Sequence, residues 1–165
     1  MDADDVINIY KLTRENGIDI WIDGGWGIDA LLEKQTRPHN DLDIAVDHKD
    51  LVKLRNLLTK RGYKEKEDSN AAEWNFVLAD NQGHEIDVHV FEFDDQRNNI
   101  YGIKYPKESL TGTGAINGQH VNCIALEYVL QFHSNYEPKE KDFKDIKALC
   151  DKFGVEPPEN YKNKL

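Results

Sequence analysis

The stretch Trp21-Ile22-Asp23-Gly24-Gly25-Trp26-Gly27-Ile28-Asp29 decides how the first part of the chain folds. It continues an alternating apolar pattern over 18–23, which predicts a strand, and it leads into a helix-forming segment at 26–33. Gly24 and Gly25 therefore join a strand to a helix. Glycines at such a junction let the backbone approach a triphosphate, and the helix N-terminus supplies amide donors. A simple strand-to-helix turn is the alternative.

A second decisive stretch is Arg37-Pro38-His39-Asn40-Asp41-Leu42-Asp43-Ile44. Its alternation predicts a strand over 41–46. Asp41 and Asp43 would project from one face of that strand, because alternate residues point the same way. Two carboxylates held together repel each other unless a cation lies between them, and such a pair suits Mg²⁺. The alternative is the solvated polar face of an edge strand. Arg37 and His39 precede the pair in a loop from which they could reach phosphate oxygens.

A third carboxylate stands on a later predicted strand. Residues 73–79 and 84–93 form a predicted hairpin, in which Glu85, Asp87 and His89 share the polar face. If this strand pairs with 41–46, three carboxylates can hold two metal ions for in-line phosphoryl displacement, and one can accept a proton from an attacking hydroxyl. Glu85 and Asp87 both remain candidates for that base.

The remaining pattern predicts an α+β fold with a mixed sheet. Asn117-Gly118 is typical of a type I′ hairpin turn, whereas 94–113 gives no clear pattern. The last helix would bury Phe143, Ile146, Leu149, Cys150 and Phe153 and end at Gly154. His133 and Tyr136 are interpreted as packing or hydrogen-bonding residues. Helices are predicted over 3–16, 26–33, 48–61, 125–133 and 140–153.

The chain has 165 residues and a formal charge of −10, and the first fifty residues hold 12 acids against 5 bases. An acidic surface disfavours nucleic acid and favours metal ions or an amine-bearing substrate. The longest apolar runs are too short to span a bilayer, and the acidic N-terminus is unlike a signal peptide. The 2 cysteines provide neither a disulfide framework nor a metal-binding spacing. We therefore expect a cytoplasmic protein with no membrane partner.

These motifs together resemble the DNA polymerase β-type nucleotidyltransferase superfamily. Within it the two quoted stretches are similar to the small antibiotic nucleotidyltransferases, first the lincosamide enzymes and next the aminoglycoside 2″-nucleotidyltransferases. The similarity extends into the C-terminal third, whereas residues 94–118 match poorly. It implies a polymerase β-like nucleotidyltransferase fold, with a mixed sheet flanked by helices. The catalytic domain would span residues 1–118, and a C-terminal hairpin strand with a small helical extension would span 119–165.

The resemblance also implies an activity: Mg²⁺-dependent transfer of AMP from ATP, or of another nucleoside monophosphate from its triphosphate, to a hydroxyl of a lincosamide, with release of pyrophosphate. Asp41, Asp43 and Asp87 would be the catalytic residues and the metal ligands, with Asp87 the favoured base. The nucleotide would be bound by Gly24, Gly25, Arg37 and His39.

Three alternatives stay open. The first is an aminoglycoside 2″-nucleotidyltransferase, which the acidity does not separate from a lincosamide enzyme. The second is a nucleotidyltransferase-type antitoxin that binds a toxin partner, and the third is a relative that binds nucleotide without turnover. The resemblance also implies a homodimer in which the neighbouring copy closes the drug site.

Overall fold

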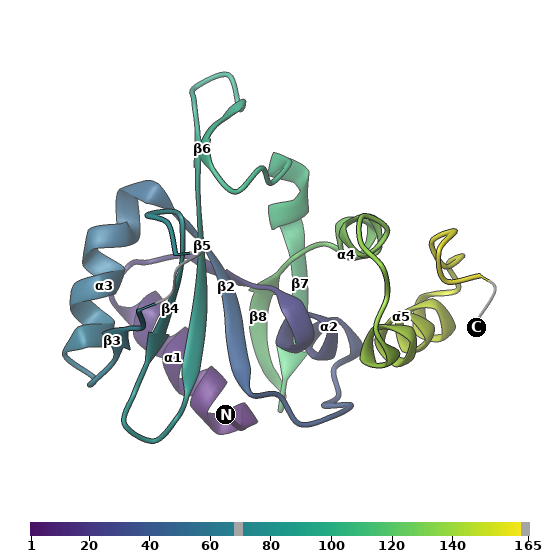
Figure 1. The fold of residues 1–165 in the computed structure, drawn as a ribbon, viewed down its shortest axis with the longest axis horizontal. Coiled ribbons are helices and arrows are strands. Elements are labelled where there is room, and N and C mark those ends of the chain that lie inside the picture. The colour runs from purple at the N-terminus through teal and green to yellow at the C-terminus, as the bar shows by residue number, and fades with distance from the viewer. Residues whose placement is uncertain (68–70, 163–165) are drawn as a thin grey trace.

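A mixed β-sheet forms the centre of the computed structural model, which describes residues 1–67 and 71–162 (Figure 1). Its strand order is β3-β4-β5-β2-β1-β8-β7, and β6 pairs with β5 outside this path. The strands are β1 (Ile20–Ile22), β2 (Asp41–Asp47), β3 (Lys64–Glu65), β4 (Asn75–Ala79), β5 (Glu85–Phe93), β6 (Asn99–Gly102), β7 (Gly112–Ile116) and β8 (Gln119–Cys123).

The pairing of β2 with β5 positions the polar residues. These strands are parallel, and their register sets Asp43 beside Asp87 and Asp41 beside Glu85. β1 runs antiparallel to β2 on its other side and parallel to β8. The predicted α+β fold with a mixed sheet is therefore confirmed, as is the predicted pairing of β4 with β5.

The same strands bury their apolar residues on the opposite face. Because side chains alternate along a strand, the carboxylates of β2 and β5 face away from these core residues. Each fully buried aliphatic side chain contributes roughly 1.5–3 kcal/mol relative to exposure in water. The core residues of the three central strands, all 0 % exposed, are Ile20, Ile22, Leu42, Ile44, Val46, Ile86, Val88 and Val90.

Five α-helices flank the sheet in the described residues, and α4 and α5 lie beyond its β7 end, where α5 contacts α2 (Figure 1). Asp2 caps the first helix through a reciprocal capping box, which satisfies two free amides. The helices are α1 (Ala3–Glu15), α2 (Gly24–Leu32), α3 (Leu51–Thr59), α4 (Leu126–His133) and α5 (Glu140–Phe153), with 3₁₀ turns η1 (His48–Asp50) and η2 (Lys107–Thr111).

The structure differs from the sequence predictions at several places, and helix bounds shift by a few residues at α2 and α3. β1 is shorter than 18–23, and the stretch without a clear pattern contains β6 and η2. Phe153, predicted to be buried, is 40 % exposed, whereas Asp142 and Asp145 of the same helix are buried. α5 therefore turns carboxylates as well as apolar residues inward, because an arginine from another segment pairs with one of them.

The C-terminal hairpin has the predicted turn, since Asn117 and Gly118 both have positive φ, of 45° and 78°. The predicted division after residue 118 falls in this turn, and β7 and β8 both belong to the central sheet. Helices α4 and α5 follow β8. The end of the predicted extension, residues 163–165, lies outside the described residues.

Candidate active site

The N-terminus of α2 lies directly against β2 because its first two residues are glycines. Gly24 has a φ of +56°, and a Cβ atom there would stand 2.0 Å from Oδ2 of Asp43. A Cβ atom on Gly25 would stand 2.3 Å from Nδ1 of His39. Asp23 caps the helix by accepting a hydrogen bond of 2.8 Å from the amide of Gly24. The glycine pair therefore brings free helix amides close to a carboxylate and an imidazole.

Asp43, Asp87 and His89 form the chemical centre of the site. One ligand atom from each lies within 4.8 Å of the others. Burial, together with the charges of Asp41, Asp23 and Asp87, raises the pKa of Asp43 to about 7 against the opposing effect of His89. Oδ1 of Asp87 is buried and has no hydrogen-bond partner within the described part of the chain.

These residues fit a divalent metal ion. A cation between Asp43 and Asp87 would offset their repulsion, and it would bind the oxygen of Asp87 that has no hydrogen bond in the described residues. Asp41 is exposed at the solvent end of β2, and it is not a member of the group of three that the described residues form.

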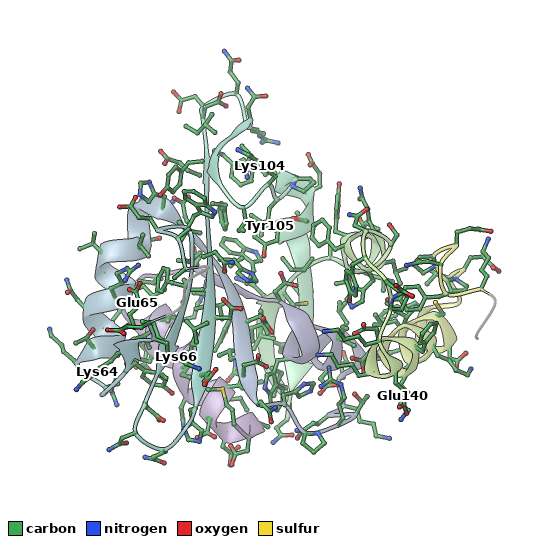
Figure 2. All side chains as sticks on the ribbon, viewed as in Figure 1. Lys64, Glu65, Lys66, Lys104, Tyr105 and Glu140 are labelled. Carbon is green, nitrogen blue, oxygen red and sulfur yellow. The ribbon has the colours of Figure 1, made fainter. Side chains whose placement is uncertain are left out.

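A chain of hydrogen bonds supports His89 from a segment far along the sequence. The hydroxyl of Tyr105 donates to Oδ2 of Asp23 at 2.7 Å and lies 3.0 Å from Nδ1 of His89. Burial by itself lowers the pKa of His89, but Asp23 and Asp87 outweigh burial and raise it to about 10. Burial raises the pKa of Asp23, and the nearby imidazole of His89, 3.8 Å away, together with the hydrogen bond from Tyr105 outweighs it, so the net shift is downward. Figure 2 labels Tyr105 in the segment between β6 and β7.

The two candidate bases on β5 have different surroundings. Glu85 accepts a hydrogen bond of 2.7 Å from Nζ of Lys66, and both side chains are more than one-third exposed. Figure 2 shows Lys66 on the β3–β4 side of the sheet, away from Tyr105. Asp87 faces Asp43 across the β2–β5 register and lies 3.6 Å from Nε2 of His89. Of these two carboxylates, Asp87 is therefore the one that belongs to the cluster with Asp43 and His89.

Arg37 and His39 belong to a network that links α2 to α5. Nε and Nη2 of Arg37 donate to Asp145, with a shortest distance of 2.9 Å, and Nη1 lies 3.0 Å from Nδ1 of His39. Because a guanidinium has no acceptor, Nδ1 of His39 accepts and Nε2 carries the hydrogen, which it donates to Asp29 at 2.5 Å. Asp29 also accepts from the amide and hydroxyl of Thr36. The loop before β2 is thus bound to α5 through Asp145 and to α2 through Asp29.

A cleft of about 220 Å³ brings most of the predicted residues together. His133 and Tyr136, which were interpreted as packing or hydrogen-bonding residues, line it and also pack against each other, with ring centroids 5.5 Å apart. Lys141, Asp142 and Asp145 were not predicted at all. The complete lining is Gly24, Gly25, Ile28, Arg37, His39, Asp41, Asp43, His133, Tyr136, Lys141, Asp142 and Asp145.

Some of the overlooked residues have a weak signal in the sequence, and others have none. His89 lies on the same face of β5 as Asp87, so the strand pattern indicates that it is close to the cluster. Tyr105 lies between β6 and η2 in a segment without periodicity, and its role appears only when the chain folds back over the sheet. Asp142 and Asp145 stand at helical spacing among charged residues that are exposed.

Comparison with known proteins relates most of the chain to one family. The family model described as Aminoglycoside-2″-adenylyltransferase matches residues 5–149. A lincosamide resistance protein of Staphylococcus haemolyticus is 30 % identical over 149 residues, which cover 86 % of this chain and 89 % of that protein. A 2″-aminoglycoside nucleotidyltransferase of Escherichia coli is 24 % identical, with 96 % of this chain and 93 % of that protein covered.

Solved structures have the same fold. A lincosamide antibiotic adenylyltransferase bound to lincomycin superposes with a TM-score of 0.77 and 26 % identity, covering 90 % of this chain and 96 % of that one. ANT(2″)-Ia in complex with adenylyl-2″-tobramycin superposes with a TM-score of 0.76 and 21 % identity, covering 92 % and 89 % of the two chains. Within residues 1–67 and 71–162, no helix has the length and apolar character needed to cross a membrane.

Proposed function

The chain belongs to the aminoglycoside-2″-adenylyltransferase family, and from this premise we propose that it transfers AMP from ATP to a hydroxyl of a lincosamide, releasing pyrophosphate. The observation that carries the proposal is the register of β2 and β5, which sets Asp43 beside Asp87 under the N-terminus of α2. The 30 % identical lincosamide resistance protein supports the choice of acceptor.

Asp41, Asp43 and Asp87 are proposed to hold Mg²⁺. The ion, when bound, neutralises the charge of the triphosphate and of the departing pyrophosphate. The buried oxygen of Asp87, which has no hydrogen-bond partner among the described residues, and the raised pKa of Asp43 support this assignment, because a bound cation would stabilise both carboxylates. Asp41, which is exposed at the start of β2, would be the third carboxylate ligand of the metal.

The nucleotide is proposed to bind at the cleft wall made by Gly24, Gly25, Arg37 and His39. The free amides of α2 favour negatively charged oxygens, and the absence of side chains at the glycines lets phosphates approach the backbone. Asp145 anchors the guanidinium of Arg37 beside Gly25, which keeps a positive charge next to that wall.

Asp87 is proposed to take the proton from the acceptor hydroxyl as its oxygen attacks the α-phosphorus. The P–O bond to pyrophosphate breaks as the new P–O bond to the acceptor forms, and the proton passes to the carboxylate. The ion pair between Glu85 and Lys66 supports Asp87 over Glu85, since it holds the glutamate at the surface.

A 2″-aminoglycoside is the second candidate acceptor, because the matching family model is named for that reaction. The net charge of −10 suits the amine of either drug class. We also propose that the protein forms a homodimer in which the neighbouring copy closes the drug site.

Pyrophosphate release with ATP and Mg²⁺, measured against a panel of lincosamides and aminoglycosides, tests the assignment. We expect release that depends on a lincosamide and is absent in an Asp43→Asn control. Release with aminoglycosides alone would select the second candidate, and release with neither class would contradict the proposed function.

A further inference from the structure

His89 adds a nitrogen donor to a cluster whose other two members are carboxylates. It follows Asp87 by two residues on β5, so both side chains project from the same face. Its register partner on β2 is Ala45, which is fully buried. Nε2 of His89 lies 3.6 Å from Oδ1 of Asp87, the buried oxygen without a hydrogen-bond partner in the described residues.

The hydrogen bonds around Tyr105 determine which nitrogen of His89 faces the cluster. The hydroxyl has one hydrogen, and the carboxylate of Asp23 can only accept, so that hydrogen lies in the 2.7 Å contact between them. The 3.0 Å contact between the Tyr105 oxygen and Nδ1 of His89 therefore needs a hydrogen on Nδ1. Nε2 is left as the atom that approaches Asp87, at 3.6 Å, in the group that also contains Asp43.

This geometry points to His89 as a ligand of the divalent cation through Nε2, alongside the carboxylates of Asp43 and Asp87, with Tyr105 and Asp23 as positioning residues. The inference rests on the proposed function, because it concerns the metal of that site. Histidines that bind metals commonly donate their other ring hydrogen to an oxygen, which fixes the tautomer and the ring orientation. Here the chain from His89 to Tyr105 to Asp23 provides that support.

A nitrogen ligand changes which metal the site prefers. Mg²⁺ binds oxygen ligands almost exclusively, whereas Mn²⁺ and later divalent metals accept imidazole readily. The site should therefore bind Mn²⁺ more tightly, relative to Mg²⁺, than a site made of carboxylates alone. In the metal-free protein Nε2 can hold a proton, which the bound cation replaces.

The test uses the full chain with Mn²⁺ alone, without nucleotide or drug. Pulsed electron paramagnetic resonance detects nitrogen nuclei coupled to bound Mn²⁺, and we expect a histidine signal in the unchanged protein. In His89→Asn the signal should disappear and the Kd for Mn²⁺ should rise by roughly tenfold or more, with a smaller change for Mg²⁺ measured by competition. Tyr105→Phe should weaken Mn²⁺ binding by roughly tenfold and alter the nitrogen coupling, while its circular dichroism spectrum stays unchanged.

His48→Asn is the matched control, because His48 pairs with Glu92 outside the cluster and is partly exposed. It should retain the nitrogen signal and the metal affinities. Mn²⁺ binding without a nitrogen signal in the unchanged protein would overturn the ligand assignment even if His89→Asn fails to fold, and it would leave the proposed function intact. A protein that binds neither Mn²⁺ nor Mg²⁺ and releases no pyrophosphate would contradict the proposed function itself.

Discussion

Asp87 and Glu85 are chemically alike and two residues apart, yet the fold gives them different surroundings. Glu85 is paired with Lys66 at the surface, whereas Asp87 stands beside Asp43 and has a buried oxygen without a hydrogen bond in the described residues. The assignment of a base therefore depends on the environment of each carboxylate, which the alternating strand pattern alone does not reveal.

Asp87→Asn should retain nucleotide binding and lose turnover by at least about 100-fold, because the amide cannot accept the acceptor proton. Steady-state pyrophosphate release and ATP binding by calorimetry measure the two effects separately. Glu85→Gln is the matched control and should retain most of the turnover. Near-normal turnover in Asp87→Asn, or a comparable loss in Glu85→Gln, would remove Asp87 as the base.

Gly24→Ala should displace Asp43, since its Cβ atom would stand 2.0 Å from Oδ2 of that residue. Gly83→Ala is the control, because Gly83 also has a positive φ, of +86°, but no atom within 4 Å of the added carbon. Both variants should lose about 1–2 kcal/mol of unfolding free energy from backbone strain. Only Gly24→Ala should lose turnover, by roughly 100-fold, because small displacements of catalytic groups are costly. Equal turnover in the two variants would show that the Asp43 contact is unimportant.

At the scale of elements, the local patterns predicted most of the fold. The alternation around Asp43 and Asp87 placed both strands, and helix boundaries followed capping residues and glycines such as Gly154. β6 and the position of Tyr105 could not be predicted, because they depend on tertiary contacts and not on a repeating pattern. The inward face of α5 was predicted wrongly at Phe153, because hydrophobic periodicity does not register a buried carboxylate paired with a distant arginine.

The pair between Arg37 and Asp145 attaches α5 to the loop before β2. Arg37→Ala would leave Asp145, whose side chain is 4 % exposed, buried without a counter-charge. We expect a loss of about 3 kcal/mol in unfolding free energy, measured by urea denaturation. The double variant Arg37→Ala, Asp145→Ala should lose less than the sum of the single changes.

Arg14→Ala is the matched control for this pair, since Arg14 and Asp19 are both more than half exposed. Exposed pairs contribute at most about 1 kcal/mol, so this variant should stay close to the unchanged protein. Equal losses in Arg14→Ala and Arg37→Ala would indicate that the Arg37 pair does not attach α5 to the sheet.

At the scale of the whole molecule, the net charge of −10 includes carboxylates that the fold concentrates in one place. Asp23, Asp43 and Asp87 come from three strand regions that the sheet brings together, and only Asp23 and Asp43 belong to the acidic first fifty residues. The metal-free fold therefore carries electrostatic repulsion at its centre, and metal binding should stabilise it.

This repulsion makes the free energy of unfolding depend on pH. Because the pKa of Asp43 is raised to about 7 in the folded state, the native protein binds more protons than the unfolded chain below that pH. The stabilisation that the protonated Asp43 contributes to the folded state is fully present below the pKa of the unfolded chain, near 4. It is lost as the pH rises through 7. Asp43→Asn should thus be more stable than the unchanged protein at pH 8 in EDTA, by at most about 4 kcal/mol, and equally stable near pH 4.

Urea denaturation at pH 4, 6 and 8 measures the difference in unfolding free energy between Asp43→Asn and the unchanged protein. Saturating Mg²⁺ should remove or reverse this difference, because only the unchanged protein keeps the full set of metal ligands. Asp95→Asn, which changes an exposed carboxylate in the turn after β5, is the charge-matched control and should show no such pH-dependent gain. A gain of the same size in Asp95→Asn would assign the effect to net charge. A loss of stability in Asp43→Asn at pH 8 in EDTA would mean that the Asp43 carboxylate is satisfied without a metal, and the metal site would have to lie elsewhere.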